Sequence, residues 1–221
     1  MKYIYSIDTL DAISMVTKSI VKHLQNNEKV LWLVSGGSGG KVSIEVARNL
    51  RNLDLSNLFV TLSDERYGPV GHTDENWQIL INGGFEVTGA TVYRPLIGVS
   101  RDETATQYSE WLTKTIKNTN HIIGIFGVGA DGHTAGIKPN SGAINTSKYA
   151  IGYTGNDFER ITITPTFIRL VDEAVVQVFG EEKHKTIQQL INEKVSITTQ
   201  PAQILKEIQE VTLYSDYKKE A

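Results

Sequence analysis

The chain has 221 residues, no cysteine, 40% hydrophobic residues and a formal net charge of -3. This length and composition predict one folded domain over residues 1–221 and exclude disulfides, thiolate metal sites and a cysteine nucleophile. The slight acidity argues against nucleic acid as a partner, and no apolar run approaches the roughly 20 residues that span a bilayer, so no membrane is expected either. The first residues, Met-Lys-Tyr-Ile-Tyr, lack the layout of a secretion signal, and the expected compartment is the cytoplasm.

Short runs of β-branched and aromatic residues alternate with longer amphipathic segments along the chain. In chain order, strands are predicted at residues 3–7, 30–34, 59–62, 122–126, 149–153, 161–164, 174–179 and 211–214. Helical spacing covers residues 10–24, 42–50, 75–81, 104–116, 183–191 and 202–208. The alternation predicts a single-domain α/β fold with a doubly wound, mostly parallel sheet and helices on both faces. Ligands of such sheets bind where strands end, so the segments that follow the strands are the candidate sites.

The first strand-end loop reads Ser35-Gly36-Gly37-Ser38, continues with Gly-Gly-Lys and leads directly into a helix. Its glycines leave backbone N–H groups free to bind an anion, and the helix N-terminus adds a favourable partial charge. The spacing matches neither a Walker A loop nor a dinucleotide GxGxxG loop. The loop therefore indicates a phosphate on a small molecule rather than ATP or NAD. The alternative interpretation is a flexible turn between strand and helix.

A second segment, Ser63-Asp64-Glu65-Arg66, follows the predicted strand at residues 59–62. Such a run of charges is most often an exposed, solvated cluster. If the strand is buried on both faces, however, Asp64 and Arg66 lie at the rim of the crevice. A guanidinium there holds an anion and a carboxylate orients it, so both residues are candidates for substrate binding.

The third loop has the clearest chemical character. Residues 127–135 read Gly-Val-Gly-Ala-Asp-Gly-His-Thr-Ala and follow the apolar strand at 122–126 without a polar linker. Glycines such as Gly129 let the backbone turn and approach a ligand closely. Asp131 supplies a hydrogen-bond acceptor and His133 a proton-transfer group. The loop predicts a catalytic site with these two side chains at its centre.

Two cations complete the candidate site. Arg160 precedes the predicted strand at 161–164, and Lys183 follows the predicted strand at 174–179. Each places a positive charge beside an apolar run, as a phosphate site requires. The alternative is that both side chains are solvated, since long cationic side chains are mostly exposed.

Other classes of active site find no support in the sequence. No HExxH or paired-histidine spacing is present, so no metal site is expected. Gly37-Ser38-Gly39 lacks the spacing of the GxSxG nucleophile elbow, so a covalent acyl-enzyme is not expected. No cofactor is predicted. The remaining histidines lie in helices, in a polar loop or at a strand start and are predicted to be structural or surface residues: His23, His72, His121 and His184.

In order and spacing, these segments resemble the 6-phosphogluconolactonases over nearly the whole chain. The resemblance rests on the Gly-Ala-Asp-Gly-His-Thr-Ala element at residues 129–135, and it is supported by Ser35-Gly36-Gly37, Ser63-Asp64-Glu65-Arg66 with Asn76, Arg160-Ile161-Thr162-Ile163-Thr164 and residues 180–183. It implies a doubly wound α/β domain, shared with the glucosamine-6-phosphate deaminases. It further implies hydrolysis of 6-phospho-D-glucono-1,5-lactone to 6-phosphogluconate in the oxidative pentose phosphate pathway, without a cofactor. The expected partner is a sugar-phosphate lactone, and the protein is expected to be a monomer or a small homo-oligomer.

Two positions depart from the family pattern. Ser38-Gly39-Gly40 stands where the family usually carries Thr-Pro, and Lys138 precedes the next proline where the lactonases have an apolar residue. The deaminases resemble the same loop but carry a glutamate at the position of Lys138 and a tyrosine at that of Arg66. Both differences favour the lactonase over a deaminase. A second alternative is a non-catalytic sugar-phosphate-binding protein, against which the presence of both catalytic candidates argues.

Lactone hydrolysis needs an activated water, stabilisation of an oxyanion and a proton for the leaving ring oxygen. We expect His133 to deprotonate the water as general base and then return the proton, while Asp131 orients the imidazole or the substrate hydroxyls. The glycine-rich backbone, with Arg66, is expected to stabilise the oxyanion. The phosphate is assigned to the loop at residues 35–40 on physical grounds, and to Arg160 and Lys183 by resemblance.

Overall fold

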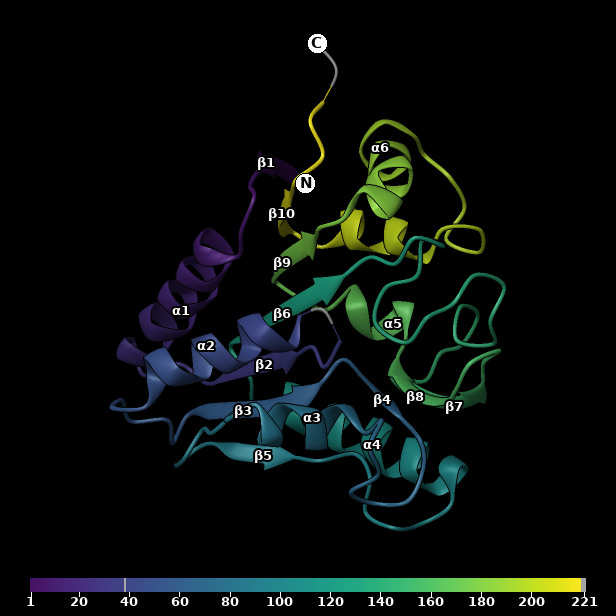
Figure 1. Ribbon diagram of the computed structural model, residues 1–221. Helices are drawn as coiled ribbons and strands as arrows, with labels where there is room; N and C mark the ends of the chain where they lie inside the picture. The colour runs from purple at the N-terminus through teal and green to yellow at the C-terminus, as the bar shows by residue number, and fades with distance from the viewer. Residues whose placement is uncertain (38, 220–221) are drawn as a thin grey trace.

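The computed structural model describes residues 1–37 and 39–219 of the chain. Strands alternate with helices over most of these residues (Figure 1). The strands are β1 (Lys2–Tyr5), β2 (Val30–Val34), β3 (Leu58–Leu62), β4 (Asp64–Arg66), β5 (Thr91–Tyr93), β6 (His121–Gly127), β7 (Ala150–Thr154), β8 (Glu159–Ile163), β9 (Glu173–Val178) and β10 (Glu210–Ser215). The helices are α1 (Leu10–Gln25), α2 (Gly40–Leu50), α3 (Asn76–Asn82), α4 (Arg101–Ile116), α5 (Pro165–Ile168) and α6 (His184–Asn192), with 3₁₀ helices η1 (Glu181–Lys183) and η2 (Pro201–Glu207).

A seven-stranded sheet in the order β1-β10-β9-β6-β2-β3-β5 forms the centre of the molecule, and every neighbouring pair in it is parallel. The strand order reverses between β2 and β6. After β2 the chain enters α2 on one face, whereas after β6 it packs Ile137 and Ile144 on the other face. A crevice opens at such a switch point, at the carboxyl ends of the strands. The predicted doubly wound α/β sheet is confirmed.

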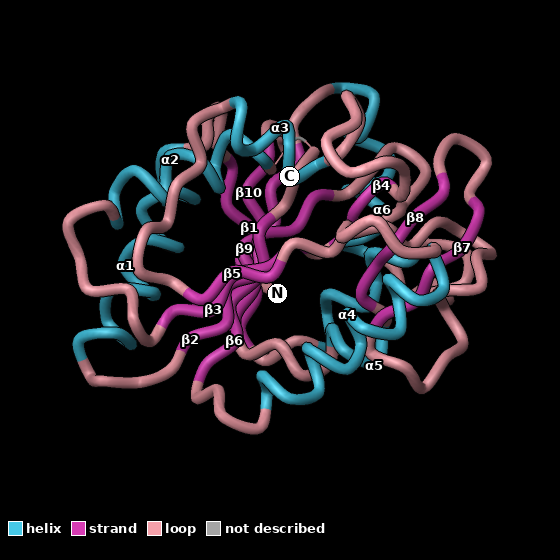
Figure 2. Tube along the Cα trace, turned by 90° about the horizontal axis from the view of Figure 1, so that it is seen from below, coloured by secondary structure: helices cyan, strands magenta, loops and turns pink. Residues whose placement is uncertain are grey.

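Helices cover both faces of the sheet, with α1 and α2 on one side and α4 and α5 on the other (Figure 2). Strand β2 shows why the sequence requires both layers. Val30, Trp32 and Val34 belong to the core on the α1–α2 side, while Leu31 and Leu33 belong to the core on the opposite side. A strand that is buried on both faces is apolar at every position instead of alternating.

The strands predicted at residues 149–153 and 161–164 exist, but they do not join the parallel sheet. β7 and β8 form a hairpin, and β8 also pairs with β4, which gives a separate antiparallel sheet in the order β4-β8-β7. The connection at residues 155–158 is the physical cause, because a parallel pair needs a crossover of roughly a dozen residues. This small sheet places Arg66 on β4 directly opposite Arg160 on β8.

The remaining differences from prediction concern short elements. β4, β5 and α5 are not predicted, because β4 is a charged triplet, β5 has three residues and α5 is a single helical turn. The segment predicted as a helix at 202–208 is a 3₁₀ helix that begins at Pro201. None of the helices formed by the described residues is both long and apolar enough to cross a membrane.

Candidate functional site

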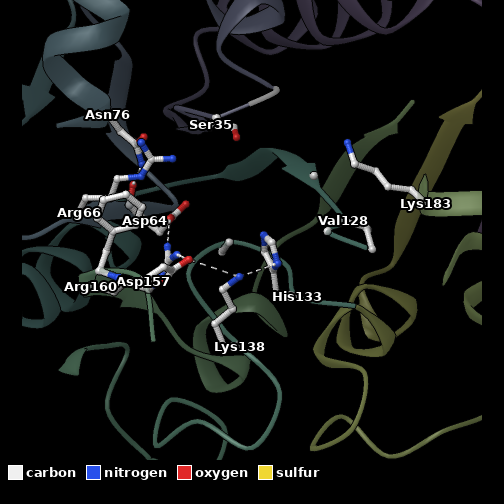
Figure 3. A pocket seen from close by; sticks show the side chains of 15 residues that line it. Ser35, Asp64, Arg66, Asn76, Val128, His133, Lys138, Asp157, Arg160 and Lys183 are labelled. Carbon is white, nitrogen blue, oxygen red and sulfur yellow. Dashed lines mark hydrogen bonds and ion pairs between the residues drawn. The ribbon is translucent and has the colours of Figure 1, made fainter. Parts of the chain in front are cut away.

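The loops that follow β2, β3 and β6 meet at the carboxyl edge of the sheet and border a cavity of about 300 Å³ (Figure 3). The β7–β8 hairpin loop and η1 contribute further walls. Eight residues predicted for the site border this cavity: Ser35, Gly37, Asp64, Arg66, Gly129, His133, Arg160 and Lys183. Gly36 and Asp131 lie behind the lining, against Asn76 and His133 respectively. Ser38 lies outside the residues that the structure describes.

The glycine pattern after β6 is needed to hold the histidine. A Cβ atom on Gly129 would lie 2.1 Å from Cε1 of His133, so no other residue fits there without moving the imidazole. Gly132 has a φ of 83°, in the left-handed region. The N–H of Gly129 donates to the His133 carbonyl at 3.0 Å, and the N–H of Gly132 donates to the Gly129 carbonyl at 2.9 Å. These two amides are therefore committed within the loop.

The imidazole of His133 is oriented by Asp131. Nδ1 of His133 lies 2.5 Å from Oδ1 of Asp131, and the same oxygen accepts the backbone N–H of His133 at 3.1 Å. The other ring nitrogen, Nε2, points into the open part of the cavity below Ser35 (Figure 3). A carboxylate at Nδ1 keeps the proton on that nitrogen and leaves Nε2 as an acceptor.

The charge of Asp131 is secured by its surroundings. Partial burial opposes ionisation, but the charge of His133, its two hydrogen bonds and the ammonium of Lys138 outweigh burial and lower the pKa of Asp131 to about 2. Nζ of Lys138 lies 3.1 Å from Oδ2 of Asp131 and 3.3 Å from Nδ1 of His133. Asp131 is thus an anion over the whole range in which histidine titrates.

Lys138 connects this pair to a second group of charges on the small sheet. Its Nζ lies 3.7 Å from Oδ2 of Asp157, which accepts a hydrogen bond of 2.8 Å from Nη2 of Arg160. Nη1 of Arg160 lies 3.8 Å from Oδ2 of Asp64. Burial raises the pKa of the Asp64 carboxyl, and the charge of Arg160 opposes this effect. Arg160 is 6% exposed, and its two terminal nitrogens face these two carboxylates, while its Nε has no hydrogen-bond partner among the described residues.

Arg66 is more available to a ligand. Its guanidinium lies 4.8 Å from the centre of the Phe158 ring, and Nη1 donates a long hydrogen bond of 3.4 Å to the Asp74 carbonyl. The Arg160 guanidinium lies 5.7 Å from the same ring. Cation–π contacts of this kind hold a guanidinium in place without neutralising it.

A fully buried carboxyl group, Glu65, supports this wall of the cavity. It accepts backbone N–H groups of Arg66 at 2.7 Å, Asn76 at 2.6 Å and Trp77 at 2.9 Å. Two of these N–H groups belong to the first turn of α3, which otherwise lacks partners for its first amides. Burial raises the pKa of Glu65 to about 8, although the three N–H donors favour the ionised form. Glu65 thereby fixes β4 to α3 and places Asn76 beside the first loop.

The first loop packs tightly on this wall. A Cβ on Gly36 would lie 2.3 Å from Cβ of Asn76, which explains a glycine at this position. Ser43 in α2 ties the loop to the helix, because its Oγ lies 3.3 Å from the backbone N of Ser35 and 3.2 Å from the carbonyl of Gly39. The loop residues Ser35 and Gly37, which line the cavity, are therefore held directly before the start of α2, where an anion site is expected.

Lys183 lies across the cavity from Arg66 and Arg160 (Figure 3). Its Nζ donates to the carbonyl of Phe179 at 3.1 Å, and its side chain is 20% exposed. Lys185, two residues further on, is exposed and does not contribute to the lining. The geometry selects Lys183 as the cation of this segment that faces the cavity.

The sequence reasoning did not assign a role in the site to several lining side chains: Asn76, Lys138, Asp157 and Phe158. Asn76 was part of the family pattern and Lys138 a departure from it, so both carried a signal. Asp157 and Phe158 carried none, because the prediction did not join β7 and β8 into a hairpin whose turn reaches the cavity.

The chain is similar to known proteins over most of its length. The family described as glucosamine-6-phosphate isomerases/6-phosphogluconolactonase matches residues 9–214. The chain belongs to this family. A 6-phosphogluconolactonase from Chlamydia pneumoniae is 24% identical over 156 residues, which cover 66% of this chain and 60% of that protein.

Solved structures of the family share the fold. A 6-phosphogluconolactonase from Shewanella baltica OS155 superposes with a TM-score of 0.81 at 19% identity, over 97% of both chains. A monomeric glucosamine-6-phosphate deaminase superposes with a TM-score of 0.78 at 16% identity, again over 97% of both chains. The fold therefore does not distinguish the two activities found in the family, and that choice depends on the side chains of the site.

Proposed function

We propose that the protein hydrolyses 6-phospho-D-glucono-1,5-lactone to 6-phosphogluconate. The observation that carries the proposal is the His133 imidazole, held by Asp131 at Nδ1, with Nε2 facing a cavity that has cations on both sides. The names of the relatives support the same reaction. An ester substrate with a phosphoryl group needs this combination of a proton acceptor and fixed positive charge.

In the proposed reaction, Nε2 of His133 accepts a proton from water while the water oxygen forms a bond to the lactone carbonyl carbon. The imidazolium that results is stabilised by the anionic Asp131. The bond between the carbonyl carbon and the ring oxygen then breaks, and the ring oxygen takes the proton from Nε2. The product carries a hydroxyl group and a carboxylic acid, which releases its remaining proton to solvent to become a carboxylate, and the histidine returns to its neutral form.

The developing oxyanion is assigned to Arg66. Because the N–H groups of Gly129 and Gly132 are bonded inside their own loop, the glycine-rich backbone supplies fewer donors than the sequence suggested. The Arg66 guanidinium borders the cavity and makes one long hydrogen bond to the described residues. The phosphoryl group is assigned to Ser35, the adjacent glycine backbone and Lys183, while Arg160 organises Asp64 and Asp157.

The second activity of the family, deamination of glucosamine 6-phosphate, fits this site less well. The ammonium of Lys138 lies within 3.3 Å of both Asp131 and His133 and adds a positive charge beside the reacting group. An amino sugar that is protonated at its nitrogen is repelled by this charge, whereas a neutral lactone ring is not. Lys138 therefore favours the lactonase.

The test is hydrolysis of freshly generated 6-phosphogluconolactone, measured as 6-phosphogluconate formed above the spontaneous rate. We expect clear acceleration by the wild type, and no release of ammonia from glucosamine 6-phosphate. In the Lys183→Met variant, KM is expected to rise about 10- to 100-fold while kcat is retained. This change in KM corresponds to the loss of one charge-assisted hydrogen bond to the phosphoryl group. Lys185→Met is the matched control and is expected to behave as the wild type.

Three results would contradict the proposal in whole or in part. The absence of acceleration by the wild-type protein would remove the lactonase assignment, and ammonia release would transfer it to the deaminase. Equal KM values for the two lysine variants would remove Lys183 from the phosphoryl site.

A further inference from the structure

Gln177 is a buried polar residue that the reaction described above does not use. It lies on β9, between Gly127 of β6 and Tyr214 of β10, and is 2% exposed. Neither Nε2 nor Oε1 of its carboxamide has a hydrogen-bond partner among the described residues. Buried amides are nearly always paired, and an unpaired one is destabilising because it has lost its bonds to water.

The surroundings of Gln177 explain its burial but not its polarity. The neighbouring positions on β9, Val175, Val176 and Val178, are buried and apolar. Because side chains alternate along a strand, Gln177 points to the same face as Val175, which belongs to the core beneath α1 and α2. An apolar side chain of similar size would pack equally well here. The polarity of the Gln177 carboxamide is therefore not explained by packing in the core.

The amide lies against the first loop of the site. A Cβ atom built on Gly39 would be 3.1 Å from Nε2 of Gln177 and 2.7 Å from Oγ of Ser35. Both groups therefore approach the same point, immediately before the start of α2. Ser35 borders the cavity (Figure 3), whereas Gln177 does not belong to its lining. Gln177 therefore lies close to a residue that faces the ligand without itself lining the cavity.

We propose that Gln177 is a positioning residue for the phosphoryl-binding loop, whose Nε2–H donates to Oγ of Ser35 in the ligand-bound protein. A serine hydroxyl has one proton and two acceptor sites. When Oγ accepts from Gln177, its own O–H is directed toward a phosphoryl oxygen. The inference rests on the proposed function, because it assumes a phosphorylated ligand in this cavity.

The test compares Gln177→Leu with the wild type. We expect KM for 6-phosphogluconolactone to rise about tenfold, the equivalent of one hydrogen bond at about 1.4 kcal/mol, with kcat changed less than about threefold. Hydrolysis of the unphosphorylated glucono-1,5-lactone is expected to keep its wild-type kcat/KM. The melting temperature is expected to stay equal or to rise, because an unpaired buried amide is replaced by an apolar group.

Gln203→Leu is the matched control. Gln203 is also a buried glutamine, but its Nε2 donates to Oε1 of Gln200 at 2.5 Å. Its replacement is expected to lower the melting temperature and to leave KM for the phosphorylated lactone unchanged. The two variants therefore separate a loss of packing from a loss of ligand binding.

Binding measured by calorimetry with 6-phosphogluconate and inorganic phosphate separates this inference from the proposed function. Weaker binding of both by Gln177→Leu supports the inference even if the wild type does not hydrolyse the lactone. Equal binding by both proteins overturns it even if the wild type is an active lactonase. Equal losses of kcat/KM on the phosphorylated and unphosphorylated lactones, with a lower melting temperature, would also overturn it by showing a structural role.

Discussion

Strand β6 has a histidine–carboxylate pair near each of its two ends, one at its first residue and one in the loop that follows it. At its carboxyl end, Nδ1 of His133 lies 2.5 Å from Asp131. At its amino end, Nε2 of His121 lies 3.3 Å from Oε2 of Glu173. The two pairs contain the same functional groups near opposite ends of one strand, but they differ in what surrounds the imidazole.

The His121 ring packs against other groups and also borders a second cavity of about 500 Å³, which Lys18 and Lys22 line as well. It stacks on His23 with ring centres 3.8 Å apart and planes 11° apart. Its Nδ1 lies 3.9 Å from Asp172, so both nitrogens face carboxylates. His133 instead has one nitrogen turned to the cavity, with cations on both sides. We therefore expect that an imidazole–carboxylate pair is not sufficient for a catalytic site, and that a ring nitrogen free of carboxylates and facing the cation-lined cavity is also needed.

The comparison is tested most strongly by replacing each histidine with alanine. His133→Ala is expected to lower kcat about 10²- to 10⁴-fold, because it removes the general base. His121→Ala is expected to leave kcat unchanged and to lower the free energy of unfolding by about 1 to 3 kcal/mol, because it leaves Glu173 with fewer partners. Lactone hydrolysis and urea unfolding of both variants measure these effects.

Either of two results would break the comparison. A folded His133→Ala protein with wild-type kcat would remove the general base from the mechanism. A large loss of kcat in His121→Ala at unchanged stability would mean that the amino end of β6 also takes part in the reaction.

The parts of the fold and the site that can be predicted from the sequence are those with a local residue pattern. The glycines around Asp131 and His133 form a pattern that can be recognised in the sequence. The structure gives its steric reason at Gly129, where a Cβ atom would collide with the imidazole. Likewise, a strand that is apolar at every position, such as β2, indicates a sheet buried on both faces. These patterns are local, and the predictions based on them for the sheet and for the family are confirmed.

Other parts of the site depend on contacts between distant segments and have no local pattern. Asp157 reaches the cavity because β7 and β8 turn back on each other and pair with β4. The occupation of Arg160 by Asp64 and Asp157 follows from the same antiparallel sheet. Neither can be inferred from spacing, because the same strands read equally well as members of the parallel sheet.

Asp131 provides a second, smaller test. Asp131→Asn replaces the anion at Nδ1 of His133 with a neutral amide, which no longer stabilises the imidazolium. We expect kcat to fall roughly 10- to 100-fold, the equivalent of 1.5 to 3 kcal/mol for a hydrogen bond to a charged group. Because the pKa of Asp131 is about 2, its titration does not contribute to the pH dependence of the wild type between pH 5 and 9. A rate profile of the variant that keeps the wild-type plateau would exclude an orienting role.

The smallest effect is expected at the other pair, from Glu173→Gln. Burial disfavours the Glu173 carboxylate, but hydrogen bonds from His121 and Ser19 and the nearby histidine charges outweigh burial and lower its pKa below 4.5. The unfolded chain binds this proton more readily than the folded protein does. The carboxylate therefore contributes stability that is present above about pH 4.5 and is lost as the pH falls through the lower folded value.

Glu173→Gln is expected to reduce the free energy of unfolding at pH 6 by about 1 to 3 kcal/mol, and by clearly less at the lowest pH at which both proteins fold. Urea unfolding at the two pH values measures the difference, and kcat is expected to equal that of the wild type. A difference that is the same at both pH values would mean that the charge of Glu173 is not what stabilises this end of β6. The His121–Glu173 pair would then stabilise the fold through packing alone. Its carboxylate charge would have no role, in contrast to the role expected for the Asp131 charge beside His133.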